Sequence, residues 1–347
     1  MKKLVVRKLF VKKSFAKKAF VVAALLFAML LVCSDAGYSA PKELKMNVTT
    51  SESSVWMVGA KEFKRLVEEK TEGRYKIAIF PNEQLSGGDL VKGVEMLFTS
   101  VTDVDIHSAI NMTGFEPKLT VVTMPWLFPN GYQSVDEILF NGEGGNRIRE
   151  LIENKGAHVI AFGENGFRQI TNNVRPITGL EDMKQLKIRT PPITMYLDLF
   201  KLFGADPTVM SYSEVFTALQ QGTIDGQENP LDTIRSAKIQ EVQKYLSIWN
   251  YSYDPIALSV SKKVWASLSD EDKKIFDDAG KIAMKAQVDA SRALDKEILD
   301  SFKSAMEVTE VLPEKIAEFQ KAASPIYEKY KDTIGEDLFN AFGYTFK

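Results

Sequence analysis

Strand and helix patterns alternate along most of this chain. In its first part, Leu44–Val48 and Tyr75–Phe80 are strand-like, and a short strand pattern follows over 103–107. Apolar residues recur at helical spacing between them, over about 55–70 and from Gly87 to Phe98. Strands that are joined through helices favour a largely parallel sheet. The sequence therefore predicts an α/β fold.

The same order returns in the second part of the chain. Strands are predicted over 157–162 and Lys187–Arg189, and a helix is predicted over about 193–203. Glu214 lies three residues after Ser211, which is the spacing of a capping box at the start of another helix. The second part is therefore also expected to be α/β.

Further signals concern the relation between these parts and the C-terminus. The segments 97–103 and 219–225 resemble each other weakly, because each runs from a helix through a turn to an aspartate. Together with the two α/β parts, this repeat predicts two similar lobes that face each other. Helical periods also cover Leu231–Leu246, a long stretch from Ser269 to about Phe302, and the chain from Pro313 to its end.

The N-terminus has the pattern of a secretory signal. Eight lysines and arginines precede an uncharged apolar run over 19–33, which is short for a membrane span. We therefore expect residues 1–36 to be a signal peptide, cleaved after Ala36 or alternatively after Ala40. A retained anchor helix and a lipid attached to Cys33 are the alternatives. Export through a cleaved signal would place the mature chain in the periplasm.

Charge and cysteine content restrict the partners of the chain. It has 44 basic and 46 acidic residues, of which residues 1–36 hold 8 and 1. The remaining 36 basic and 45 acidic residues give a net charge of −9, which argues against nucleic acid and anionic membranes as partners. Cys33 is the only cysteine, so a chain without this leader has neither a disulfide nor a cysteine ligand for a metal.

Several motifs between residues 163 and 230 indicate the chemistry of the site. They are Gly166-Phe167-Arg168, Leu186-Lys187-Ile188-Arg189-Thr190-Pro191-Pro192, Ser213-Glu214-Val215-Phe216 and Asp225-Gly226-Gln227-Glu228-Asn229-Pro230. Arginine presents a planar set of donors that matches a carboxylate bidentately, and it stays charged. The motifs contain no nucleophile elbow, metal cluster or phosphate loop. They are typical of a site that binds a carboxylate without transforming it.

In the order and spacing of these motifs, the chain resembles the solute-binding proteins of tripartite ATP-independent periplasmic (TRAP) transporters, of the C4-dicarboxylate-binding type. The resemblance extends from about Leu44 to about Asp277. It includes Phe80-Pro81-Asn82, Met124-Pro125-Trp126-Leu127-Phe128 and Val260-Ser261-Lys262-Lys263-Val264-Trp265.

The resemblance implies a two-lobed periplasmic solute-binding fold with a hinge and a ligand cleft between the lobes. One lobe would comprise residues 41–166 and 255–294, and the other would comprise residues 167–254 and 295–347. A long C-terminal helix would span both lobes. Closure about the hinge would bury the ligand.

Arg189 is the principal candidate for the ligand site. Pro191-Pro192 end its strand, which places Arg189 at the carboxyl end, where ligands bind in open α/β sheets. A solvated strand face is the alternative that the residues alone leave open. In the resembled family, the arginine of this Ile-Arg-x-Pro motif is the main partner of the carboxylate.

Three further candidates lie in the second lobe. Arg168 follows the strand 157–162, and the resemblance implies a second substrate contact there; a surface arginine in a crossing loop is the alternative. Asn229 precedes Pro230 in the pattern of a helix N-cap, and it matches a substrate-contacting asparagine of the family. Tyr212 matches an aromatic wall of the family's pocket, and its alternative is a core position.

The first lobe contributes Asp89, Ser108 and Asn111 as weaker candidates. Asp89 begins a helix, where its alternative role is to complement the helix dipole. Ser108 follows a strand at the predicted crevice. Sialic-acid-binding members of the family have glutamate and arginine at the positions that match Ser108 and Asn111, so sialic acid is not the expected ligand. Four large aromatics are candidates for either the pocket wall or the core: Trp56, Trp126, Phe128 and Trp249.

The leading hypothesis is an extracytoplasmic solute-binding subunit that captures a small organic acid and delivers it to separate membrane permease subunits. No cofactor, metal or nucleic acid is expected, and His107 and His158 are too few and too isolated for a metal site. A ligand-sensing subunit for a membrane receptor is one alternative. An exported enzyme that acts on an organic acid is the other, with Asp89 as its candidate base.

Overall fold

The computed structural model describes residues 40–346 of the 347-residue chain. Contacts divide the chain into units 1–41 and 42–347, and the fold below is that of the second unit. The expected signal peptide and Cys33 lie outside the described residues. Within residues 40–346, no helix is both long enough and apolar enough to cross a membrane.

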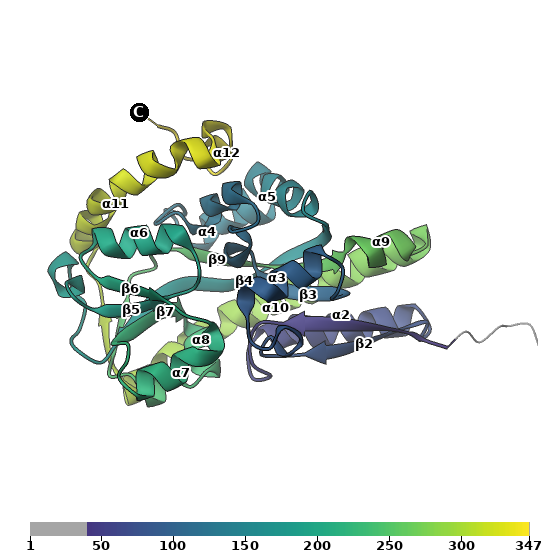
Figure 1. Ribbon diagram of the computed structural model, residues 1–347, viewed down its shortest axis with the longest axis horizontal. Coiled ribbons are helices and arrows are strands. Elements are labelled where there is room, and N and C mark those ends of the chain that lie inside the picture. The colour runs from purple at the N-terminus through teal and green to yellow at the C-terminus, as the bar shows by residue number, and fades with distance from the viewer. Residues whose placement is uncertain (1–39, 347) are drawn as a thin grey trace, which may run out of the picture. The chain divides into compact units, whose positions relative to one another are not determined.

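The first strands and helices follow the order that the sequence predicts. β1 (Lys42–Val48) lies between β2 (Tyr75–Phe80) and β3 (Val104–Ser108), and all three strands are parallel. The connections run through α2 (Trp56–Lys70) and α3 (Leu90–Phe98) (Figure 1). The predicted elements of this part are confirmed.

The second part repeats this arrangement. β5 (Lys187–Thr190) pairs in parallel with both β6 (Asp206–Val209) and β7 (Gly226–Pro230). The crossovers contain α6 (Thr194–Leu202) and α7 (Tyr212–Gln220). At the start of α7 a carboxylate oxygen of Glu214 accepts a hydrogen bond from the backbone N–H of Ser211 at 3.2 Å, as the capping-box pattern predicts.

The weak repeat in the sequence corresponds to the same local structure in both parts. A carboxylate oxygen of Asp103 accepts a hydrogen bond from the backbone N–H of Lys45 at 2.9 Å, and Asp225 accepts one from Lys187 at 2.8 Å. The backbone N–H of each aspartate donates to the carbonyl oxygen of the same lysine. Each aspartate thus ties a helix-to-strand turn to the neighbouring parallel strand.

Two long antiparallel strands join the two parts into one sheet. β4 (Ala157–Asn172) pairs with β9 (Tyr253–Ser261) and with β7, and β9 pairs with β3, in the order β2-β1-β3-β9-β4-β7-β5-β6. The expected largely parallel sheet is therefore mixed. The predicted strand ended at Phe162, but β4 continues to Asn172, because its polar side chains beyond Phe162 are buried and hydrogen-bonded within the protein.

The helix predicted over Leu231–Leu246 is wrong for most of its length. α8 covers only Leu231–Ser236, and Lys238 adopts a left-handed conformation with φ of 58°, which a continuing helix cannot accommodate. The chain then forms β8 (Tyr245–Ile248), which pairs with β4 and, in parallel, with β10 (Glu307–Glu310).

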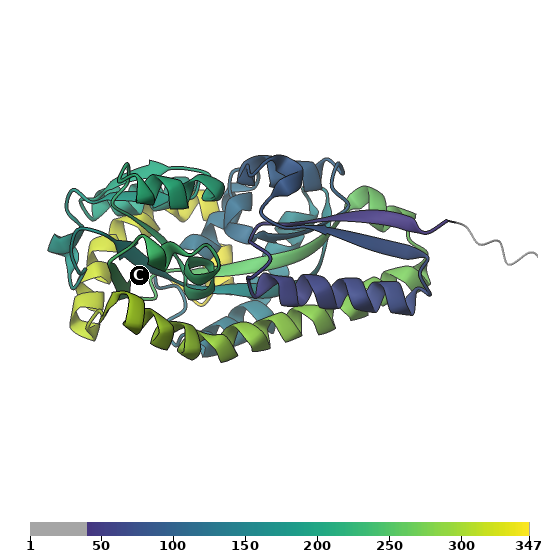
Figure 2. The ribbon, with the colours of Figure 1, turned by 90° about the horizontal axis from the view of Figure 1, so that it is seen from below.

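A long helix, α10 (Asp270–Ala305), packs against elements of both parts: α2 and β4 on one side, α8 and β10 further along (Figure 2). It begins at Ser269, whose hydroxyl accepts a hydrogen bond from the N–H of Asp272 at 3.1 Å. The approach to β4 is close, since a Cβ added at Gly280 would lie 2.2 Å from Cγ2 of Ile160. This helix is the one that the resemblance implies.

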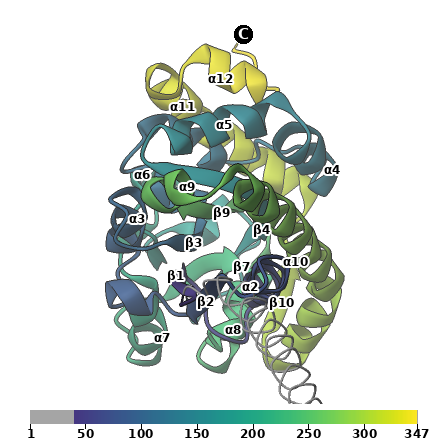
Figure 3. The same cartoon turned by 90° about the vertical axis from the view of Figure 1, so that its right-hand side faces the viewer.

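The remaining α-helices include α5 and α9, which contact β4, and α11, which packs against α6. The helix predicted from Pro313 to the end is interrupted at Gly335, whose φ of 90° ends α11 before α12 packs beside α5 (Figure 3). Their bounds are α4 (Tyr132–Val135), α5 (Glu143–Glu153), α9 (Lys262–Ser267), α11 (Pro313–Ile334) and α12 (Glu336–Ala341).

Candidate ligand-binding site

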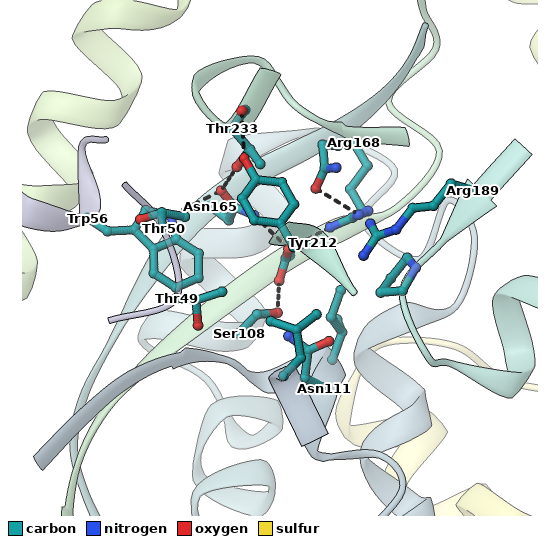
Figure 4. A pocket seen from close by; sticks show the side chains of 15 residues that line it. Thr49, Thr50, Trp56, Ser108, Asn111, Asn165, Arg168, Arg189, Tyr212 and Thr233 are labelled. Carbon is teal, nitrogen blue, oxygen red and sulfur yellow. Dashed lines mark hydrogen bonds and ion pairs between the residues drawn. The ribbon is translucent and has the colours of Figure 1, made fainter. Parts of the chain in front are cut away.

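The ends of parallel strands from both parts of the sheet meet at one small cavity (Figure 4). Thr49 and Thr50 follow β1, and Ser108 ends β3. From the second part, Arg189 lies near the end of β5 and Asn229 near the end of β7. The centre of a water molecule can move within a volume of about 30 Å³ inside this cavity. Its position agrees with the rule that ligands bind at the carboxyl ends of strands in α/β sheets.

Most of the residues that the sequence nominates lie around this cavity. The lining includes Arg189, Arg168, Asn229, Tyr212, Ser108 and Asn111. Asp89 does not line it: its carboxylate accepts hydrogen bonds from the N–H groups of Val91 at 2.9 Å and Lys92 at 3.0 Å, so it caps α3. Asp89 therefore has its alternative role at the start of α3, where its carboxylate faces the N–H groups of the first turn.

Arg189 is a buried cation without an anionic partner. Its side chain is 1% exposed, and Nε and Nη2 both donate to the backbone carbonyl of Met210, at 2.9 and 2.7 Å. Among residues 40–346, no carboxylate forms an ion pair with it. Burial lowers the pKa of Arg189 to about 10. The guanidinium therefore stays charged at neutral pH, and a carboxylate at this position would relieve its desolvation.

Arg168 has the opposite environment. Its Nε and Nη2 donate to the carboxylate of Glu228, its Nη1 donates to Asp254 at 2.6 Å, and Nη2 also donates to Oδ1 of Asn229 at 3.1 Å. Burial alone would lower the pKa of Arg168, but the charges of Glu228 and Asp254 raise it well above its usual value. Arg168 is 2% exposed and lies inside β4, so the interpretation as a surface arginine in a crossing loop is wrong.

Asn229 and Tyr212 reach the cavity from the second part. Asn229 belongs to β7 and does not cap α8, because pairing of β7 with β4 continues through Pro230, which occupies the N-cap position. Its side chain donates to Oε1 of Gln227 at 2.5 Å. Tyr212 is the first residue of α7, and its hydroxyl donates to the carbonyl of Thr233 at 3.0 Å.

Asn165 of β4 and Asp254 of β9 line the cavity but were not among the candidates that the motifs indicated. Asp254 accepts hydrogen bonds from the hydroxyl of Ser108 and from the amide of Asn165, the latter at 2.8 Å. Burial raises the pKa of Asp254, although Arg168 and these hydrogen bonds lower it in part. A single acid within the otherwise uncharged strand β9 was the signal that could have identified it.

Of the four aromatic candidates, only Trp56 lines the cavity. Its Nε1 donates to Oδ1 of Asn165 at 3.1 Å, so Trp56 both lines the cavity and holds Asn165 in position. Phe128 and Trp249 belong to a hydrophobic core, and Trp126 is partly buried and packs against it, so all three match the core alternative.

A second buried ionic cluster lies beside the cavity in the first part. His107 of β3 is fully buried, and its Nε2 lies 3.1 Å from Oε1 of Glu83. Burial by itself lowers the pKa of His107, but the charge of Glu83 and their hydrogen bond raise it to about 9. His107 is therefore a structural cation that pairs with Glu83. Within residues 40–346, no group of three or more histidines, cysteines and acids is placed to hold a metal ion.

Comparison with known proteins identifies the family. The model of the DctP family, described as "Bacterial extracellular solute-binding protein, family 7", matches residues 46–333. This chain belongs to that family. The chain is also 32% identical over 270 residues to the 2,3-diketo-L-gulonate-binding periplasmic protein YiaO of Escherichia coli (strain K12), which covers 77% of this chain and 80% of that protein. The resemblance to TRAP solute-binding proteins is confirmed.

Solved structures of the family share the fold. A TRAP periplasmic solute-binding protein from Polaromonas sp. JS666, bound to D-erythronate, is 34% identical, with a TM-score of 0.83 and coverage of 88% of this chain and 99% of that one. Another from Sulfurospirillum deleyianum DSM 6946, with bound succinate, is 27% identical, with a TM-score of 0.82 and coverage of 89% and 100%. The two-lobed solute-binding fold is thereby confirmed.

Proposed function

We propose that this DctP-family protein binds the carboxylate of a small organic acid at Arg189 and presents the acid to the membrane subunits of a TRAP transporter. The observation that carries this proposal is the buried, unpaired guanidinium at the edge of the cavity. A buried cation is costly unless an anion accompanies it. A carboxylate fits the planar donors of arginine bidentately, and it would supply the missing charge.

The neighbouring residues would orient this acid. Arg168 lies in the adjacent part of the sheet, where Glu228 and Asp254 hold its guanidinium in place. Asn229 is positioned by its hydrogen bond with Arg168, and Tyr212 by its hydrogen bond with Thr233. These fixed side chains would define one shape of ligand without rearranging when it binds.

Closure of two lobes would enclose the acid. We propose lobes of residues 41–166 with 255–294 and of 167–254 with 295–347, joined where β4, β9 and α10 cross. Contacts between the proposed lobes favour a closed arrangement: the hydroxyl of Ser54 donates to Asp232 at 2.8 Å, and the backbone N–H of Val55 donates to the same carboxylate at 3.0 Å. Such contacts would break on opening, so ligand binding and closure would be coupled.

The remaining parts of the proposal concern location and partners. Membership of an extracellular solute-binding family supports an exported, periplasmic protein that works with separate permease subunits. We propose that no chemical step occurs in the cavity, since Asp254, which lines it, is engaged by Arg168. After prolonged incubation with the protein, the bound acid should be recovered unchanged. Recovery of a chemically converted product would instead favour the alternative that the protein is an exported enzyme.

Arg189→Ala tests the proposed site directly. The variant should bind its organic acid about 30-fold to several thousand-fold more weakly, because removing one partner of a buried charge pair costs about 2–5 kcal/mol. Arg189→Lys should also bind poorly, since an ammonium group cannot make the bidentate contact. Calorimetric titration measures both, with Arg147→Ala as control, because Arg147 pairs with Asp337 at the surface. Near wild-type affinity in a folded Arg189→Ala protein would refute the site.

A further inference from the structure

We propose that the cavity selects a short monocarboxylate whose other polar groups are hydroxyls, and that Asp254 excludes a second carboxylate. This inference rests on the proposed function, because it takes Arg189 as the partner of the first carboxylate. It adds the charge and the hydrogen-bonding character of the rest of the ligand, which membership of the family leaves open.

The cations of the cavity can hold only one carboxylate. Two arginines line it, but the charge of Arg168 is already matched by Glu228 and Asp254, which lie at ion-pair distance from its guanidinium. Arg189 alone remains without an acid among residues 40–346. A second carboxylate on the same ligand would therefore be buried without a cation, which is strongly unfavourable.

The wall opposite Arg189 is neutral. In Figure 4, Thr49, Thr50 and Trp56 lie on the other side of the cavity from Arg189. The hydroxyl of Thr50 is buried, and within the described part of the chain it has no hydrogen-bond partner. Buried polar groups are almost always paired, so a polar but uncharged ligand group is expected to meet this hydroxyl.

Asp254 determines which neutral group is preferred. Its carboxylate lines the cavity and is 1% exposed, and it already accepts from Ser108, Asn165 and Arg168. A carboxylate accepts about four hydrogen bonds, so capacity for a further donor remains. A ligand hydroxyl can donate to it, whereas a ligand carboxylate has no proton to donate and carries a charge of the same sign.

Probes of equal length test this selection, because they then differ only in charge and in hydroxyl groups. The cavity is bounded by side chains that hydrogen-bond to one another. Three acids with four carbons are therefore suitable probes. D-erythronate has one carboxylate and hydroxyls, succinate has two carboxylates, and L-malate has two carboxylates and one hydroxyl.

The experiment is calorimetric titration of the wild-type protein with these three acids. D-erythronate should bind at least about 100-fold more tightly than succinate or L-malate, since like-charge juxtaposition costs several kcal/mol. L-malate separates the two causes of discrimination: if it binds as weakly as succinate, the charge excludes it and its hydroxyl does not compensate. Arg189→Ala is titrated in parallel to verify that the first carboxylate is bound where we propose.

Asp254→Asn is the variant that tests the excluding residue. It removes the charge and keeps the shape, and Arg168 remains paired with Glu228. It should bind succinate and L-malate at least about tenfold more tightly than the wild type does, because like-charge repulsion is removed. Asp278→Asn is the matched control, because Asp278 lies on the exposed face of α10 and pairs with Lys274.

The outcomes distinguish this inference from the proposed function. If succinate or L-malate binds the wild type as tightly as D-erythronate and Arg189→Ala weakens that binding, the proposed function stands and this inference is overturned. Unchanged dicarboxylate affinity in folded Asp254→Asn protein overturns the role of Asp254. If neither these acids nor a wider panel of monocarboxylates binds, both proposals fail. If Asp254→Asn does not fold, the relative affinities of the wild-type protein for D-erythronate, succinate and L-malate still test the proposed selectivity.

Discussion

Arg168 and Arg189 lie in neighbouring regions of the same sheet, and both are almost fully buried, yet their surroundings differ completely. Arg168, on β4, is held by the carboxylates of Glu228 and Asp254. Among residues 40–346, the guanidinium of Arg189, on β5, donates only to the carbonyl oxygen of Met210. The difference shows that burial of an arginine does not by itself indicate a role. A buried arginine with two acids stabilises the fold, and one without an acid is available to an anion from solution.

Replacing each arginine by methionine should give the largest contrast. Arg168→Met leaves Glu228 and Asp254 buried without a cation, and it should lower the free energy of unfolding by about 3–5 kcal/mol. Arg189→Met removes a buried positive charge that is not paired with a carboxylate, so the stability of the unliganded protein should stay the same or rise. Denaturant unfolding of both variants without ligand measures this. Equal losses of stability would show that the two arginines do not differ in the way that we infer.

A third buried cation, His107, sharpens the comparison through pH. Its pKa of about 9 in the folded protein lies above the ordinary value of 6.5, because of Glu83. The pair therefore stabilises the protein fully below pH 6.5, and the stabilisation is lost as pH rises to about 9. The loss should be about 3 kcal/mol, since one pKa unit corresponds to about 1.4 kcal/mol. Asp105, also buried, faces the same histidine and has its pKa raised by burial.

The measurement is the free energy of unfolding between pH 6 and 9.5 for the wild type and His107→Gln. The difference between the two proteins should shrink as pH rises, because only the wild type loses the ion pair. Other groups that titrate in this range, such as Glu164 with a pKa raised to about 7 by burial, contribute equally to both and cancel. A difference independent of pH would mean that His107 is not a paired cation.

The smallest expected effect concerns Asp232, an acid outside the cavity. It accepts hydrogen bonds from Ser54 and Val55 of the other proposed lobe, so it would act only when the lobes are closed. Asp232→Asn should weaken ligand binding by about 3- to 10-fold, which is the contribution of one hydrogen bond. The weaker binding should arise from faster dissociation of the ligand. Stopped-flow tryptophan fluorescence measures that rate. An unchanged dissociation rate, equal to that of Asp278→Asn, would argue against a closing contact here.

Local patterns were sufficient wherever neighbours along the chain decide the structure. Capping at Ser211 and Ser269, the strands of each part and the strand end at Pro191-Pro192 all follow from residues within a few positions of one another. The position of Arg189 at a strand end could therefore be expected, and so could the family. The alternation of strands and helices fixed the α/β class for the same reason.

Long-range pairing decided the rest. Whether polar residues of β4 are exposed or buried depends on β7, β9 and α10, which lie far away in the sequence, so the strand appeared to end at Phe162. The same pairing brings Glu228 and Asp254, 60 and 86 positions away, onto Arg168, while no acid in the described part of the chain forms an ion pair with Arg189. The sequence by itself determined which residue types could bind an acid. Only the tertiary structure decided which arginine is free to do so, because charge pairing is set by contacts across the sheet.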